Sequence, residues 1–171
     1  MNKCVFLDRD GVINLERGDY TYKLEDFEIL PGVVESIIRL KSAGFFIVVI
    51  TNQAGIMKGV YTRQQMNECH KKLQIACSNN IDSIYYCPYH PSITESLARK
   101  PDTLMFEKAI SKYRIDPQKS WMVGDRERDI IPAHKLGMRT ALVTNDKTES
   151  IADYQTSDLA QATEIILGEG Q

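Results

Sequence analysis

Short apolar segments alternate with amphipathic segments along this chain of 171 residues. The apolar segments are rich in β-branched and aromatic residues and are too short for buried helices, so they predict strands. They cover residues 3–7, 45–50, 83–87, 121–123 and 140–143. Strands that alternate with helices form a parallel sheet with helices on both faces. We therefore expect an α/β protein with a Rossmann-like, doubly wound parallel sheet.

Four helices are predicted from apolar residues spaced at helical intervals. The first follows Pro31, the second begins after a capping hydroxyl at Thr62, the third contains Met105, and the fourth covers residues 129–136. Gly137 ends the fourth helix, because glycine readily adopts the left-handed conformation common after helix C-termini.

The length and charge of the chain exclude several classes of protein. Domains usually hold roughly 100 to 200 residues, so we expect a single domain over residues 1–171. The formal net charge is −2, which provides no basic field for nucleic acid or an anionic membrane. The longest apolar run, residues 45–50, is far shorter than a membrane span, and the N-terminus shows no export signal. We expect a cytoplasmic monomer without membrane or nucleic-acid partners.

Polar residues follow the predicted strands where the strands end. In open parallel sheets, ligands bind beyond the carboxyl ends of the strands. Four distant segments are therefore expected to meet at one site. They supply Asp8 and Asp10 after the first strand, Thr51, Asn52 and Gln53 after the second, Arg99 and Lys100 in the loop after the third, and Gly124, Asp125, Arg126 and Asp129 after the fourth.

The acidic residues of this set predict a metal site. A pair such as Asp8 and Asp10 is a weak signal alone, because such pairs also cap helices and tighten turns. Here Gly11 follows, which lets the chain turn sharply and lets backbone amides face an anion. Further carboxylates at Asp125 and Asp129 could not all stay ionised without a cation between them, and oxygen ligands favour magnesium. Asp129 has two open interpretations, a metal ligand or a partner of the following helix.

Lys100 and Thr51 complete a predicted phosphate site. Lys100 offers a fixed positive charge and Thr51 a hydroxyl donor. Such groups neutralise the oxygens of a transferring phosphoryl group, where catalysis is mostly positioning and charge stabilisation. The interval between Asp10 and Thr51 is already filled by a loop and a helix. We therefore expect no separate cap domain and an open site shaped by loops.

The motifs resemble those of the haloacid dehalogenase superfamily of phosphatases over nearly the whole chain. The resemblance implies that Asp8 attacks phosphorus to give an aspartyl-phosphate, while Asp10 protonates the leaving oxygen and later deprotonates water. It implies Mg²⁺ held by Asp8, the Asp10 carbonyl and Asp125, so that metal contact keeps Asp8 ionised and Asp10 can hold a proton. Thr51 and Lys100 are implied as catalytic residues. The matching motifs are Asp8-Arg9-Asp10-Gly11-Val12, Thr51, Lys100 and Gly124-Asp125 through Asp129.

Within the superfamily, the chain is similar to the subfamily of heptose 1,7-bisphosphate phosphatases and histidinol-phosphatases. The similar segments are residues 8–14, 51–56, 85–88 and 99–101. The resemblance implies D-glycero-D-manno-heptose 1,7-bisphosphate as the substrate, losing its 7-phosphate, with histidinol phosphate as the alternative. A nucleic-acid 3′-phosphatase and a non-catalytic phosphosugar-binding domain are more distant alternatives. The implied substrate contacts are Glu16, Gly18, Asn52, Gln53, Arg99 and Arg126.

The cysteine pattern departs from that subfamily. Its members often hold a structural zinc through Cys-x-His and a later Cys-x-Cys. Here Tyr89 stands two residues after Cys87, His90 is displaced by one, and no cysteine lies between Cys87 and Lys100. A four-ligand thiolate site cannot be assembled, so we predict no zinc and a reshaped specificity loop. The other cysteines lack the spacing of a disulfide framework and are predicted to be buried thiols: Cys4, Cys69 and Cys77.

Overall fold

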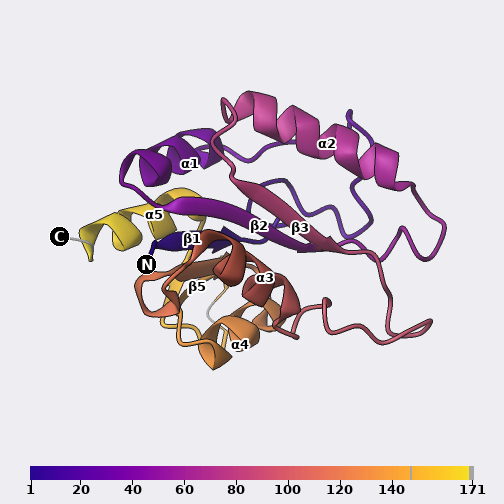
Figure 1. Cartoon of the computed structure of the whole chain (residues 1–171). Helices are drawn as coiled ribbons and strands as arrows, with labels where there is room; N and C mark the ends of the chain where they lie inside the picture. The colour runs from indigo at the N-terminus through magenta and orange to yellow at the C-terminus, as the bar shows by residue number, and fades with distance from the viewer. Residues whose placement is uncertain (147, 170–171) are drawn as a thin grey trace.

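The computed structural model describes residues 1–146 and 148–169 and contains a six-stranded parallel sheet flanked by helices (Figure 1). The strand order is β3-β2-β1-β4-β5-β6, and all neighbours pair in parallel. The predicted α/β Rossmann-like fold is confirmed. The strands are β1 Cys4–Leu7, β2 Phe46–Asn52, β3 Ser83–Cys87, β4 Trp121–Gly124, β5 Arg139–Val143 and β6 Tyr154–Thr156.

The helices cover both faces of the sheet. In Figure 1, α1 and α2 lie on one side, and α3 and α4 lie on the other. All four predicted helices are present, whereas α5 and the short β6 were not predicted. The helices are α1 Val33–Ser42, α2 Arg63–Ala76, α3 Leu104–Tyr113, α4 Glu127–Lys135 and α5 Leu159–Gly168, with a 3₁₀ turn at Pro117–Lys119.

Helix α2 begins as its sequence predicts. The Thr62 hydroxyl accepts from the backbone N–H of Gln65, and the Gln65 side chain accepts from the Thr62 backbone N–H. This capping box satisfies two of the N–H groups that a helix start leaves free. Gly137, with φ 79°, follows α4 as predicted. Helix α4 begins at Glu127, two residues before the predicted start, because an Asp129 oxygen accepts from the backbone N–H of Arg126 at 3.1 Å.

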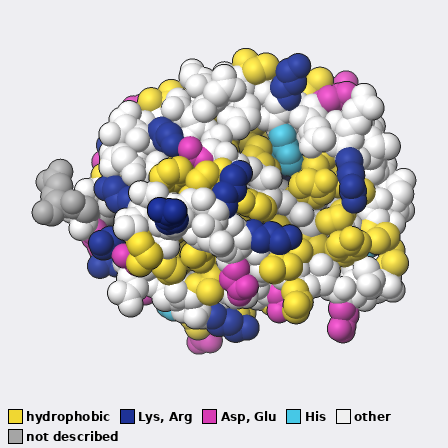
Figure 2. Space-filling model, viewed as in Figure 1, with side chains coloured by type: hydrophobic (Ala, Val, Ile, Leu, Met, Phe, Trp, Pro, Cys, Tyr) yellow, Lys and Arg dark blue, Asp and Glu magenta, His cyan; other side chains and the backbone are white. Residues whose placement is uncertain are grey.

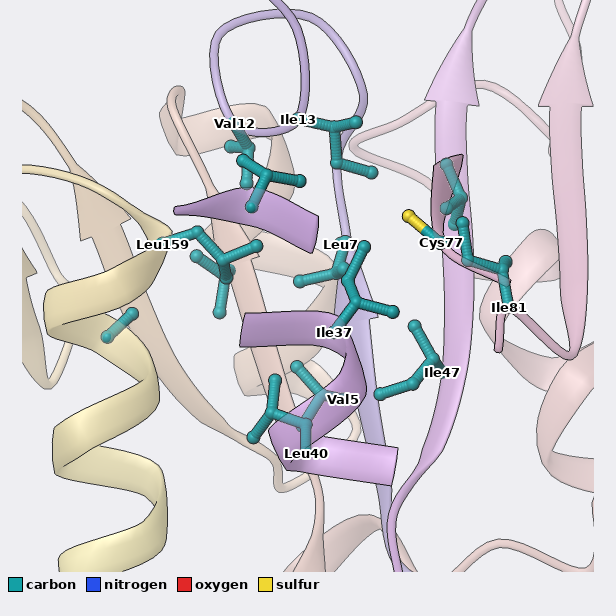
Figure 3. Packing of buried hydrophobic residues seen from close by; sticks show 14 of the residues in the cluster. Val5, Leu7, Val12, Ile13, Ile37, Leu40, Ile47, Cys77, Ile81 and Leu159 are labelled. Atoms are coloured by element: carbon teal, nitrogen blue, oxygen red, sulfur yellow. The ribbon is translucent and has the colours of Figure 1, made fainter. Parts of the chain in front are cut away.

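The core has two halves because alternate residues of a strand point to opposite faces of the sheet. Val5 and Leu7 of β1 pack with residues of α1, α2 and α5, whereas Cys4 and Phe6 pack with residues of α3 and α4. Figure 3 shows the first half, with Ile37 of α1 close to Val5 and Leu7. All four cysteines are buried free thiols, including the three for which burial was predicted.

Loops, rather than a second domain, surround the carboxyl ends of the strands. Among the described residues, the segments between β1 and α1, between β2 and α2, and between β3 and α3 are mostly irregular, and none forms a separate cap. On the face shown in Figure 2, basic side chains are interspersed with acidic and apolar ones. No helix within the described ranges has the length and apolar character to cross a bilayer.

Candidate active site

Beyond the ends of β1 and β4, a buried lysine lies between two aspartates. The Lys100 Nζ is 2.8 Å from Asp8 Oδ1 and 2.6 Å from Asp129 Oδ1, and it donates to the Ile50 carbonyl at 2.7 Å. Lys100 is 1% exposed and Asp129 0%. Burial acts to lower the pKa of Lys100, but the Asp129 and Asp8 charges outweigh it and raise that pKa above its ordinary value. The lysine therefore remains an ammonium ion.

Three carboxylates cluster around this lysine. Asp8, Asp125 and Asp129 each offer an oxygen, and these oxygens lie within 4.8 Å of one another. Burial, with the charge of Asp129, raises the pKa of Asp8 to about 7 and that of Asp125 to about 6. A cation among the three would favour their ionised forms. Asp125 Oδ1 is buried without a hydrogen-bond partner in the described residues, so the cluster fits a hard divalent ion such as Mg²⁺.

Two glycines let the backbone approach these carboxylates. A Cβ on Gly11 would lie 2.5 Å from Asp125 Oδ2, and one on Gly124 would lie 2.3 Å from the Asp129 Cβ. Gly11 also has φ 84°, in the left-handed region that favours glycine. The turn predicted at Gly11 is present, and it brings the loop after β1 against the loop after β4.

Asp129 is engaged through both of its oxygens. Oδ1 pairs with Lys100, and Oδ2 accepts from the backbone N–H of Arg126 at 3.1 Å. Asp129 Oδ1 makes no hydrogen bond in addition to this ion pair, whereas Asp125 Oδ1 has neither a hydrogen bond nor an ion pair among the described residues. This geometry favours the interpretation of Asp129 as a partner of Lys100 and of the start of α4. It leaves Asp125 better suited to hold an ion.

Asp10 lies in a different electrostatic environment from Asp8. Its Oδ1 accepts from Arg9 Nη2 at 2.8 Å and from Asn14 Nδ2 at 3.0 Å, and its Oδ2 accepts from Arg9 Nε and Gln53 Nε2, both at 3.2 Å. Burial would raise the pKa of Asp10, but the Arg9 charge and these donors lower it below its usual value. The family resemblance implies that Asp10 can hold a proton, and in this arrangement the guanidinium of Arg9, which is buried against Asp10, favours the carboxylate form.

Thr51 and Asn52 are the last residues of β2, and Gln53 follows the strand. The three side chains make different contacts. Thr51 is buried, and its Oγ1 accepts from Gln53 Nε2 at 2.9 Å. The Asn52 amide donates to the Lys100 carbonyl and accepts from the Lys100 backbone N–H, both at 3.1 Å. Asn52 thus fixes the backbone that carries Lys100, a role that its position in the sequence did not indicate.

An open cavity of about 590 Å³ lies beside Asp10, Asn52 and Gln53. All of the residues predicted to contact a substrate line it. Glu16 accepts from the backbone N–H of Gly18 at 2.8 Å, which closes a tight turn at one edge of the cavity. The predicted residues in the lining are Asp10, Glu16, Gly18, Asn52, Gln53, Arg99 and Arg126, whereas Asp8, Thr51, Lys100 and Asp125 do not line it.

Three arginines that line the cavity are here called the arginine wall: Arg99, Arg126 and Arg128. Arg99 donates to the Tyr89 carbonyl at 3.1 Å, and Arg126 Nε lies 3.2 Å from Asp125 Oδ2. Arg128, in the first turn of α4, also lines the cavity and was not predicted. Burial, with the like charge of Arg128, lowers the pKa of Arg99. Such a concentration of positive charge is suited to an anionic ligand.

The loop that carries Arg99 contains the displaced histidine. His90 Nδ1 lies 2.6 Å from the Ser92 hydroxyl, and Cys87 is a buried thiol at the end of β3. Whether the chain binds zinc stays a prediction. The cluster of potential metal ligands found among residues 1–146 and 148–169 consists of Asp8, Asp125 and Asp129.

Comparisons with known proteins find relatives that match this chain over most of its length. Residues 97–166 match the family model of HAD-hydrolase-like proteins. The D-glycero-beta-D-manno-heptose-1,7-bisphosphate 7-phosphatase of Haemophilus ducreyi is 34% identical over 167 residues, covering 92% of this chain and 91% of that protein. The protein of the same name from Photorhabdus laumondii is 35% identical over 180 residues, covering 96% and 95%.

Solved structures are similar over the same extent. The D,D-heptose 1,7-bisphosphate phosphatase of B. bronchiseptica, in complex with magnesium and phosphate, superposes with a TM-score of 0.88 at 28% identity and covers 99% of both chains. The D,D-heptose 1,7-bisphosphate phosphatase of Burkholderia thailandensis gives a TM-score of 0.70 at 28% identity, covering 96% of this chain and 98% of that one.

Proposed function

Because this chain belongs to the haloacid dehalogenase-like phosphatases, we propose that it removes the 7-phosphate from D-glycero-D-manno-heptose 1,7-bisphosphate. The observation that carries the proposal is the buried Lys100, paired with Asp8 and Asp129 directly beside Asp125. Such an arrangement presents a nucleophilic carboxylate and a fixed positive charge to one phosphoryl group. The two bacterial 7-phosphatases that resemble the chain over more than nine tenths of its length support this choice of substrate.

The buried residues have distinct roles in the proposed reaction. Asp8 attacks phosphorus, Lys100 neutralises charge on the phosphoryl oxygens, and Thr51 donates its hydroxyl hydrogen to one of them. Asp8, Asp125 and the Asp10 carbonyl would hold Mg²⁺, which when bound neutralises further phosphoryl charge. Asp129 keeps Lys100 charged and in place through the 2.6 Å ion pair.

Asp10 carries the proton between the two halves of the proposed reaction. Arg9, Asn14 and Gln53 favour its carboxylate form, which is the form able to take a proton from the water that hydrolyses the aspartyl-phosphate. In the next turnover that proton passes to the leaving sugar oxygen. Each cycle therefore returns Asp10 to its starting state, and no proton is gained or lost by the residue.

The arginine wall supports a substrate with two phosphates. Arg99, Arg126 and Arg128 line the same cavity, and a guanidinium can bind phosphate oxygens in pairs. One phosphate of a bisphosphate would bind at Asp8 and the other at this wall. Glu16 lines the same cavity, and its carboxylate can accept hydrogen bonds from sugar hydroxyls.

A phosphate-release screen tests the proposal. The substrates are both anomers of heptose 1,7-bisphosphate, histidinol phosphate and a 3′-phosphorylated oligonucleotide, each with and without Mg²⁺. We expect the highest kcat/KM for a heptose bisphosphate and no release by Asp8→Asn. Equal, poor turnover of all substrates would contradict the proposed specificity, and preferential cleavage of histidinol phosphate would reassign the substrate.

A further inference from the structure

The hydroxyl of Tyr61 lies inside the site, against the side chain of Gln53. It donates to Gln53 Oε1 at 2.5 Å. Tyr61 is 5% exposed and Gln53 2%. The Tyr61 ring stacks on Tyr22, with centroids 5.0 Å apart and planes 7° apart. Both partners of the hydrogen bond are thus held in place and shielded from water.

Room for the Tyr61 ring depends on a glycine in the loop that follows Gln53. A Cβ on Gly55 would lie 2.1 Å from Tyr61 Cε1. No side chain could occupy that space without displacing the ring. The loop therefore admits the tyrosine close enough for its hydroxyl to reach Gln53.

The direction of the Gln53 amide follows from its neighbours. Asp10 can only accept hydrogen bonds while it is paired with Arg9, so the Gln53 nitrogen must face it, at 3.2 Å. The same nitrogen lies 2.9 Å from Thr51 Oγ1. The amide oxygen then faces Tyr61, which has the only hydroxyl hydrogen placed to satisfy it among the described residues. The Tyr61 hydroxyl therefore favours the orientation in which the Gln53 oxygen faces Tyr61 and the Gln53 nitrogen faces Asp10, because it donates a hydrogen bond to that oxygen.

A reversed amide would impair both of its catalytic neighbours. The Gln53 oxygen would then face Asp10, where it would repel the carboxylate form and would accept the proton of the acid form, which the leaving sugar oxygen needs. It would also accept the hydroxyl hydrogen of Thr51, which the observed arrangement leaves free for a phosphoryl oxygen.

We propose that Tyr61 is a positioning residue for phosphoryl transfer, because its hydroxyl orients the Gln53 amide toward Asp10 and Thr51. The inference rests on the proposed phosphatase mechanism. In that step an Asp8 oxygen forms a bond to phosphorus while the bond from phosphorus to the sugar oxygen breaks. The sugar oxygen keeps the electron pair of the broken bond and takes the Asp10 proton, so the sugar leaves as a neutral alcohol.

Tyr61→Phe tests the inference, because it removes the hydroxyl and keeps the ring. The matched control is Tyr22→Phe, which removes a hydroxyl from the partner ring without touching Gln53. The measured quantity is kcat/KM, which covers the steps up to the aspartyl-phosphate. The substrates are heptose 1,7-bisphosphate, whose leaving alkoxide needs a proton, and 4-nitrophenyl phosphate, whose leaving group needs none.

We expect Tyr61→Phe to lower kcat/KM about tenfold for the bisphosphate and about threefold or less for 4-nitrophenyl phosphate, as for the loss of one buried hydrogen bond. Tyr22→Phe should change both by less than about twofold. In a Gln53→Met background, Tyr61→Phe should add less than about twofold. Equal losses on both substrates, or a full further loss in the Gln53→Met background, would overturn the inference.

Two further measurements keep the inference testable if a variant folds poorly or the substrate proposal fails. Gly55→Ala displaces the ring with its hydroxyl intact and should reproduce the substrate-dependent loss. By NMR, the side-chain NH₂ of Gln53 should exchange with water at least about tenfold faster in Tyr61→Phe. Unchanged exchange would overturn the inference whatever the substrate, whereas absent turnover of the bisphosphate by the wild-type protein would contradict only the proposed function.

Discussion

Two parts of the active site carry positive charge, and they differ in their exposure to solvent. One is the floor, which consists of Lys100 with Asp8, Asp125 and Asp129, and the other is the arginine wall of the cavity. On the floor, Lys100 is 1% exposed and contacts two aspartates. On the wall, Arg99 is partly buried, Arg128 is exposed, and the Arg126 side chain is 60% exposed. A buried charge interacts strongly with its neighbours, and its side chain is held in one position. Solvent screens the interactions of an exposed charge and leaves its side chain free to move. The floor is therefore suited to chemistry and the wall to recognition.

The largest expected effect on the floor comes from Asp8→Asn. The amide cannot form an aspartyl-phosphate, so phosphate release should fall by at least about 10⁴-fold. Thermal unfolding of the variant should remain cooperative, which checks that the fold is intact. Retained magnesium-dependent turnover would show that the floor does not act through this carboxylate.

Lys100→Met should reduce kcat by about 10²-fold to 10³-fold, because it removes the fixed charge beside the phosphoryl group. It also leaves Asp8 and Asp129 buried without a cation, which should cost about 3 to 5 kcal/mol of unfolding free energy. The control is Lys119→Met, whose side chain is 67% exposed beside Asp116 and whose loss should cost less than about 1 kcal/mol. Similar denaturation midpoints for both variants would show that the buried lysine stabilises the protein no more than the exposed one does.

The two remaining acids of the floor should respond differently to magnesium. Asp125→Asn should raise the Mg²⁺ concentration for half-maximal activity by at least about tenfold, because Asp125 has an oxygen free for the ion. Asp129→Asn should mainly lower kcat, because it removes a partner of Lys100. Magnesium titrations of both variants separate these roles. A larger shift for Asp129→Asn would assign the ion to that residue instead.

On the wall, Arg99→Ala should raise KM for heptose 1,7-bisphosphate about tenfold, with little change in kcat. Arg128→Ala should raise it about threefold, because its exposed charge is screened. Arg63→Ala, exposed at the start of α2, serves as the control and should leave KM unchanged. A loss of kcat without a change in KM would place the arginines in the chemistry instead.

Much of the fold was predictable because hydrophobic periodicity and strand-end polarity are local signals. The missed α5 also carries such a signal: Asp158 caps it, and Leu159, Ala162 and Ile166 are buried at helical spacing. The three-residue strand β6 offers too short a pattern to recognise.

The sequence indicates which segments meet beyond the strand ends, but it does not indicate how their side chains pair. The sequence indicates that Lys100 and the aspartates meet, yet the role of Arg9 depends on the loop that brings the Thr21 carbonyl to its guanidinium, at 2.8 Å. Tyr61 similarly acquires its contact with Gln53 from the space above Gly55. Such long side chains can point in many directions, and tertiary packing selects one of them.

The most direct test of the account is mass spectrometry of the protein quenched in acid during turnover of heptose 1,7-bisphosphate with Mg²⁺. We predict one added phosphoryl group on the peptide that contains Asp8, absent from the Asp8→Asn variant. Steady turnover with no phosphorylated Asp8 peptide, or with the added group on another residue, would contradict the account.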